Sequence, residues 1–86
     1  FALSQNFPNP FNPSTTIRFS VPKNSNVTLE IFDVTGRLVK TLAKNELATA
    51  GINEISFNAS SYASGIYFYT LTSGDFSETK KMILVK

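Results

Sequence analysis

QNFPNPFNPSTTIRFSVP, residues Gln5–Pro22, changes character halfway along its length. The first half holds prolines at positions 8, 10 and 13 among asparagines and two phenylalanines. Proline cannot donate to a β-ladder, cannot continue a helix, and pushes the residue before it toward extended geometry. We therefore predict an extended lead-in over residues 1–14, in which at least one of Phe7 and Phe11 is buried against a folded body.

The second half alternates apolar and polar residues, which is the period of a β-strand with one buried face. Ile17, Phe19 and Val21 form the apolar set of this strand. The same period recurs in NVTLEIFD (26–33), INEISFN (52–58), IYFYTLTS (66–73) and FSETKKMILVK (76–86). Each stretch is predicted to be a strand, and the most apolar one, residues 66–73, is predicted to lie centrally.

The stretch DVTGR, residues 33–37, predicts a tight bend between two strands. Asp33 suits the first position of a type I turn, and Gly36 suits the left-handed position that closes it. The strand that begins at Arg37 is predicted to fade after Leu42. The following NELATAG is predicted to be a loop, with one helical turn as an option.

Six or seven short strands joined by loops rich in Gly, Ser, Asn and Asp predict an all-β fold. We expect an immunoglobulin-like antiparallel β-sandwich of about seven strands over residues 15–86, with the lead-in of residues 1–14 packed on it. The predicted core consists of Ile17, Phe19, Val27, Leu29, Ile31, Leu38, Leu42, Ile55, Phe57, Tyr67, Tyr69, Leu71, Met82 and Leu84.

Composition argues against several classes of function. The 86 residues include no cysteine and no histidine, which removes disulfides, thiolate sites and imidazole ligands. The net charge of +2 is too small to indicate nucleic-acid binding. No apolar run approaches the ~20 residues that span a bilayer, and no catalytic motif is present. We expect a monomer without enzyme activity, cofactor or metal. Because the sequence opens on Phe1, we also expect it to be part of a longer protein.

Five stretches follow one another in the order typical of one family: NFPNPFNPSTTIRFSVP, VTLEIFDVTGRLVKTL, AGINEISFN, SGIYFYTL and KKMILVK. Over residues 5–86 the chain resembles the type A C-terminal sorting domain of the type IX secretion system of Bacteroidetes-like bacteria. A similar lead-in and turn occur in the immunoglobulin-like domain of the flagellar hook-capping protein. The ending at Lys86, directly after the last predicted strand, favours the sorting domain.

The resemblance implies a non-catalytic C-terminal sorting signal that directs a fused N-terminal cargo protein across the outer membrane. It implies transit through the periplasm, recognition of the folded domain by an outer-membrane secretion translocon, and removal by a sortase-like protease. The cargo would then reside at the cell surface or outside the cell.

The last predicted strand is the candidate recognition element, because an edge strand can bind a partner by strand addition. We expect its lysines to contact an acidic receptor, the alternative being a solvated edge whose lysines discourage aggregation. The recognition candidates are Lys80, Lys81, Met82, Leu84 and Lys86. The other candidates are the turn residues Asp33, Gly36 and Arg37, and the lead-in residues Phe7, Pro8, Asn9, Pro10, Phe11, Asn12 and Pro13, which serve either as a tag or as a cap on the sandwich.

Two other functions stay open at this point. A glycan-binding accessory module of a secreted polysaccharide-degrading enzyme would expose a row of aromatic rings for sugar stacking. The rings available are Phe32, Tyr62, Tyr67, Phe68 and Tyr69, although a small domain needs most of them in its core. A structural domain like that of the hook-capping protein is the second alternative.

Overall fold

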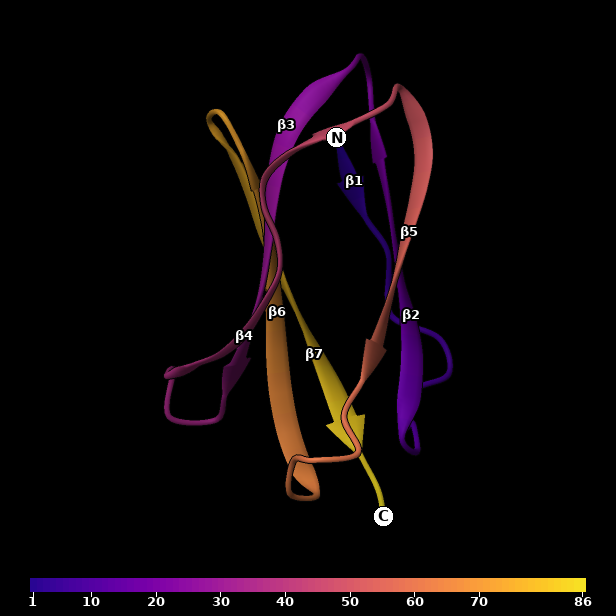
Figure 1. Cartoon of the computed structure of the whole chain (residues 1–86), viewed down its shortest axis with the longest axis vertical. Helices are drawn as coiled ribbons and strands as arrows, with labels where there is room; N and C mark the ends of the chain where they lie inside the picture. Colours follow the sequence, from indigo (N-terminus) through magenta and orange to yellow (C-terminus); the bar gives the residue numbers. More distant parts are fainter.

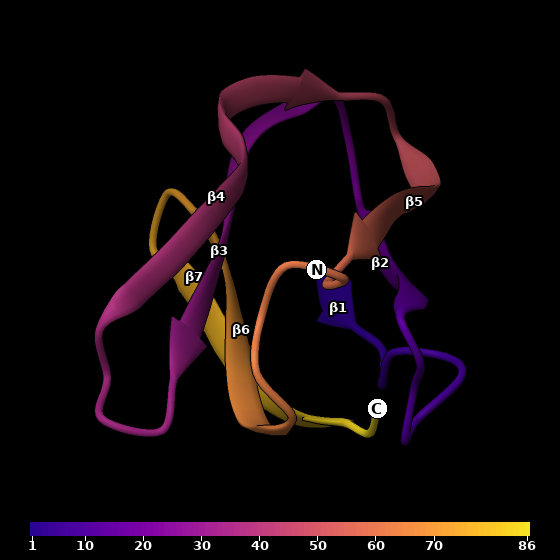
Figure 2. The same ribbon diagram turned by 60° about the horizontal axis from the view of Figure 1, so that its bottom comes forward.

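The computed structural model describes all 86 residues. They form seven β-strands with connecting loops and no helix (Figure 1). The strands are β1 (Ala2–Leu3), β2 (Ser14–Val21), β3 (Ser25–Asp33), β4 (Leu38–Ala48), β5 (Gly51–Asn58), β6 (Gly65–Ser73) and β7 (Phe76–Leu84). They form a three-stranded sheet in the order β1-β2-β5 and a four-stranded sheet in the order β4-β3-β6-β7. All strand pairs are antiparallel, and Figure 2 shows the two sheets as facing layers. The predicted all-β antiparallel sandwich is confirmed.

The alternation of apolar and polar residues sets which face of each strand is buried. In β2, the apolar residues Ile17, Phe19 and Val21 are buried. Arg18, between Ile17 and Phe19, is exposed. This strand pairs with β5 without a bulge over its whole length, from Ser14↔Asn58 to Val21↔Gly51. Because side chains at alternate positions share a face, the outer face of this sheet carries the polar residues of both strands.

One hydrophobic core of 17 buried residues fills the space between the sheets. Its largest fully buried side chains include Tyr69, Phe11, Phe19 and Phe57. The predicted core residues are buried with three exceptions. Leu42 and Ile55 are only partly buried at the margin of the core, and Leu38 is 49% exposed.

The prediction for Leu38 was wrong because β4 is bulged. Between the pairs Ile31↔Lys40 and Phe32↔Leu38, β4 carries one residue more than β3. An extra residue reverses the face on which the following side chains lie. Val39 consequently packs against the core, and Leu38 lies exposed.

The predicted end of β4 after Leu42 was also wrong, as was the predicted loop with its optional helical turn. β4 continues to Ala48, pairing with β3 as far as Ser25↔Ala48. Asn45 adopts a positive φ of 49° at a bulge, and its N–H donates to Thr28 Oγ1 at 3.0 Å. This part of β4 belongs to an edge strand that is largely exposed to solvent. Its sequence is therefore mostly polar and resembles that of a loop.

Phe7 and Phe11 of the lead-in lie in opposite environments. Phe11 is 2% exposed, and its ring centroid lies 6.2 Å from that of Phe57. Phe7 is 80% exposed, although its backbone forms two hydrogen bonds with Thr16, both 3.0 Å long. The lead-in therefore contributes one ring to the core and presents the other on the surface.

A buried tyrosine ties the start of the chain to the four-stranded sheet. The Tyr69 hydroxyl donates to the carbonyl of Ser4 at 2.7 Å and accepts from the N–H of Asn6 at 2.8 Å. The side chain of Asn6 in turn donates to Thr15 Oγ1 at 3.0 Å. Since β1 and β2 lie in one sheet and Tyr69 in the other, these bonds link the two layers.

Replacing Phe11 with alanine is expected to lower the free energy of unfolding by about 3–5 kcal/mol, because it removes a buried ring and leaves a cavity. The matched variant F7A removes the same side chain from an exposed position and is expected to change that free energy by less than about 0.5 kcal/mol. Urea unfolding followed by circular dichroism measures both. Equal losses in the two variants would contradict the placement of these rings.

Tyr69 is expected to make stability sensitive to alkaline pH. Burial raises the pKa of Tyr69 from 10.0 to about 12. Because the pKa is raised in the folded protein, the contribution of neutral Tyr69 to the free energy of unfolding is complete below pH 10 and is lost as the pH rises toward 12. The variant Y69F is expected to lack this loss. It is also expected to unfold about 1–3 kcal/mol more easily at pH 7, since Ser4 and Asn6 lose their buried partner. Urea titrations of both proteins across this pH range test the effect, and an equally steep alkaline loss in Y69F would refute it.

Candidate recognition surface

The five recognition candidates of the last strand divide into buried and accessible residues. Met82 and Leu84 are buried in the core. Lys81, which directly precedes Met82 and lies in the opposite phase, is exposed on the outer face of the four-stranded sheet. Lys80 is half-buried, with its Nζ 3.4 Å from Glu78 Oε2. Lys86, beyond the strand, is exposed and donates from Nζ to the carbonyl of Ser60 at 2.7 Å.

The free edge of β7 is partly covered by the lead-in. The N–H of Phe11 donates to the carbonyl of Ile83 at 2.9 Å, and the N–H of Val85 donates to the carbonyl of Phe11 at 3.0 Å. Side chains complete the cover: Asn9 Oδ1 accepts from the N–H of Ile83 at 2.9 Å, and Gln5 Nε2 donates to the carbonyl of Lys81 at 2.7 Å. A strand added beside residues 81–85 would therefore have to displace the lead-in.

The turn after β3 is held by the carboxylate of Asp33. Its Oδ1 accepts from the hydroxyl of Thr35 at 2.6 Å, from the N–H of Thr35 at 2.9 Å and from the N–H of Arg37 at 3.0 Å. These bonds favour the charged form, so the hydrogen bond from the Thr35 side chain, followed by that from the Arg37 backbone, holds the pKa of Asp33 below 3.8. Gly36 closes the turn with a φ of 87°. Every hydrogen bond that this carboxylate accepts comes from within the turn.

The five aromatic rings considered for sugar stacking do not form an exposed row. Tyr67 and Tyr69 are buried, and Tyr62 packs against the core beside Phe57 and Tyr67. Phe32 and Phe68 are paired across β3 and β6 and are half-buried on the outer face of the four-stranded sheet. The expectation that most of these rings lie in the core is met in part: Tyr67 and Tyr69 belong to the core, and Tyr62 packs against its margin.

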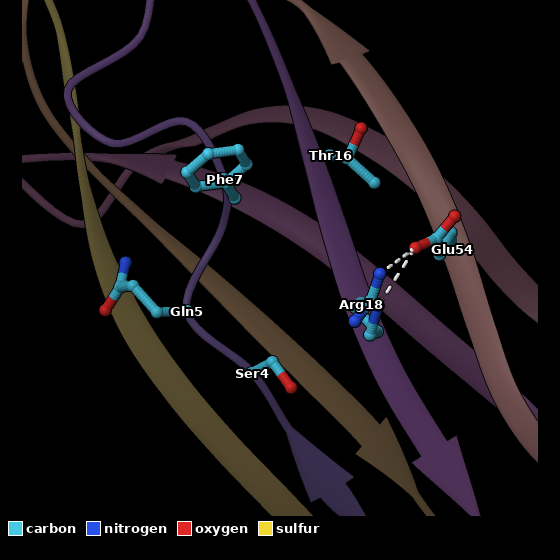
Figure 3. A pocket seen from close by; sticks show the side chains of 6 residues that line it. All are labelled: Ser4, Gln5, Phe7, Thr16, Arg18 and Glu54. Atoms are coloured by element: carbon cyan, nitrogen blue, oxygen red, sulfur yellow. Dashed lines mark hydrogen bonds and ion pairs between the residues drawn. The ribbon is translucent and has the colours of Figure 1, made fainter.

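A hollow of about 340 Å³ lies on the outer face of the three-stranded sheet (Figure 3). It is lined by Ser4, Gln5, Phe7, Thr16, Arg18 and Glu54. Arg18 of β2 and Glu54 of β5 are register partners, and Arg18 donates from Nε at 2.9 Å and from Nη2 at 2.6 Å to Glu54 Oε2. Sequence analysis missed this site. In the sequence, each of the two strands has a charged residue at an outward-facing position. That these two residues are neighbours follows only from the register between the strands.

No group of three or more His, Cys, Asp or Glu side chains is placed to hold a metal ion. No helix of sufficient length and apolarity to cross a membrane is present.

Comparison with known proteins gives the family of the chain. No curated protein matches it significantly. The family model described as the secretion system C-terminal sorting domain matches residues 5–86, which includes the lead-in, both sheets and the last strand. The chain therefore belongs to the family of C-terminal sorting domains of the type IX secretion system.

Proposed function

We propose that this domain is a non-catalytic sorting signal that an outer-membrane translocon recognises in its folded state. It directs the cargo fused ahead of it from the periplasm to the cell surface or the medium, where a sortase-like protease removes the domain. Family membership supports the sorting role and delivery to the surface or beyond. The position of β7, which is both part of the core and partly accessible, supports recognition of the folded form.

The backbone of β7, which carries Lys81, is held in place by its pairing with β6 and by the core. Nine register pairs with β6, from Gly65↔Leu84 to Ser73↔Phe76, align β7, and its residues Met82 and Leu84 anchor it between the sheets. Lys81 consequently projects from a rigid strand and forms no ion pair. A receptor with acidic side chains can bind this ammonium group without having to order the backbone that carries it.

The buried and exposed candidates have different parts in this proposal. Lys81 and Lys86 contact the receptor directly. Met82 and Leu84 act through the fold, because they are enclosed in the core. Lys80 is partly neutralised by Glu78 and contributes less to the attraction.

Reversing the charges of Lys81 and Lys86 tests the contact with the receptor. A reporter fused ahead of Phe1 and carrying K81E/K86E is expected to be exported about tenfold more slowly, since like charges would now face each other; tenfold corresponds to about 1.4 kcal/mol. The matched control K40E/K44E makes the same change of charge on β4, the opposite edge of the same sheet. It is expected to export normally. Fractionation of periplasm and medium measures both, and equal export of the two variants would refute the contact.

Substitution of Met82 tests whether the folded domain is recognised. M82A is expected to unfold about 2–5 kcal/mol more easily, because it leaves a cavity in the core, whereas M82L conserves volume and costs less than about 1.5 kcal/mol. Export of the M82A reporter should fall in step with the unfolded fraction measured by circular dichroism, and M82L should export normally. Normal export of a largely unfolded M82A domain would show that a linear segment is recognised instead.

A further inference from the structure

We propose that the hollow between Phe7 and the Arg18–Glu54 pair binds a neutral pyranose sugar. The ring of Phe7 would stack on the apolar face of the sugar, and the ion pair would hold its hydroxyl groups. This site lies on the three-stranded sheet, whereas the proposed receptor contacts lie at the end of the four-stranded one, so the inference does not rest on the proposed sorting function.

The hollow has an exposed aromatic ring, Phe7, on a rigid backbone. Phe7 is fixed by its two hydrogen bonds with Thr16 and by the proline that follows it. Its ring is nevertheless 80% exposed, while Phe11 of the same segment is buried. The ring thus contributes little to the core. Because the backbone that carries it is already ordered, a ligand that binds the ring does not have to order this segment of the chain.

Polar groups without a protein partner line the hollow together with this ring. Both Arg18 nitrogens that bond Glu54 reach the same oxygen, Oε2, which leaves Glu54 Oε1 and Arg18 Nη1 without a protein partner. The hydroxyls of Ser4 and Thr16 form no side-chain hydrogen bond either. An acceptor beside a donor suits two neighbouring hydroxyl groups, each of which both donates and accepts.

The lining of the hollow disfavours ligands of other classes. Arg18 is already neutralised by Glu54, so the hollow offers no free positive charge to a phosphate or nucleotide. The backbone of β2 beneath it is bonded on both sides, to β5 throughout and to the lead-in through Thr16 and Arg18. No main-chain groups remain there for an added peptide strand. A ligand must be recognised by side chains, and the volume of about 340 Å³ is at the lower end of small-ligand sites.

Binding can be tested by titrating the ¹⁵N-labelled 86-residue chain with the methyl pyranosides of glucose, galactose and mannose. We expect saturable chemical-shift changes at the amides of Phe7, Arg18 and Glu54 for at least one sugar, with a dissociation constant on the order of 1 mM, as suits a ligand of this size. F7Y should retain binding because it keeps the ring. F7A and R18K should each weaken it about tenfold or more, since one loses the stacking surface and the other the forked donor.

The control I52A removes another exposed apolar side chain from β5, outside the hollow, and should bind as the unaltered chain does. Amide spectra of every variant confirm that it is folded. Absence of saturable shifts with all three sugars would overturn the proposal, as would F7A binding with unchanged affinity. Because the readout is sugar binding alone, such a failure would leave the sorting proposal standing.

Discussion

The docking of Phe11 is the interaction on which the two ends of the chain depend. Its ring lies in the core against Phe57, and its backbone bonds Ile83 near the end of β7 and Val85 just beyond that strand. Phe11 thus joins a segment near the start of the chain to its last residues, beside the bonds from Asn9 and Gln5. The stabilisation comes from burial of the ring, while the hydrogen bonds decide which strand the lead-in lies beside.

The edges of the two sheets are protected by different means. β1 has only two residues, β4 is irregular at three points along its pairing with β3, and β7 is covered by the lead-in near its end. Short length, bulges and a covering segment each reduce unwanted pairing between chains. A partner that adds a strand at the end of β7 must compete with Phe11 and Asn9. A partner that contacts the side chain of Lys81 meets no such competition.

Much of the fold was predictable because alternation is a local property. The strands around Ile17, Leu29, Tyr69 and Met82 follow from the period of two, as does the turn at Asp33. β4 was not predictable to the same degree, since each bulge shifts the phase and its polar end resembles a loop. The candidate site divides in the same way. The last strand and the burial of its Met82 and Leu84 were predicted from the period of two. The hydrogen bonds by which the lead-in covers the edge of β7 were not predicted, because they join residues far apart along the chain.

The sequence by itself determined the class of fold, the face that most strands bury, the turn that joins β3 to β4, and a family resemblance that the family match confirms. Each of these depends on residues within a few positions of one another. Only the tertiary structure decided that Phe11 is buried while Phe7 is exposed, and that Arg18 meets Glu54. These outcomes depend on the register between strands and on the packing of the lead-in, which join residues far apart along the chain and are set by the energy of the whole core.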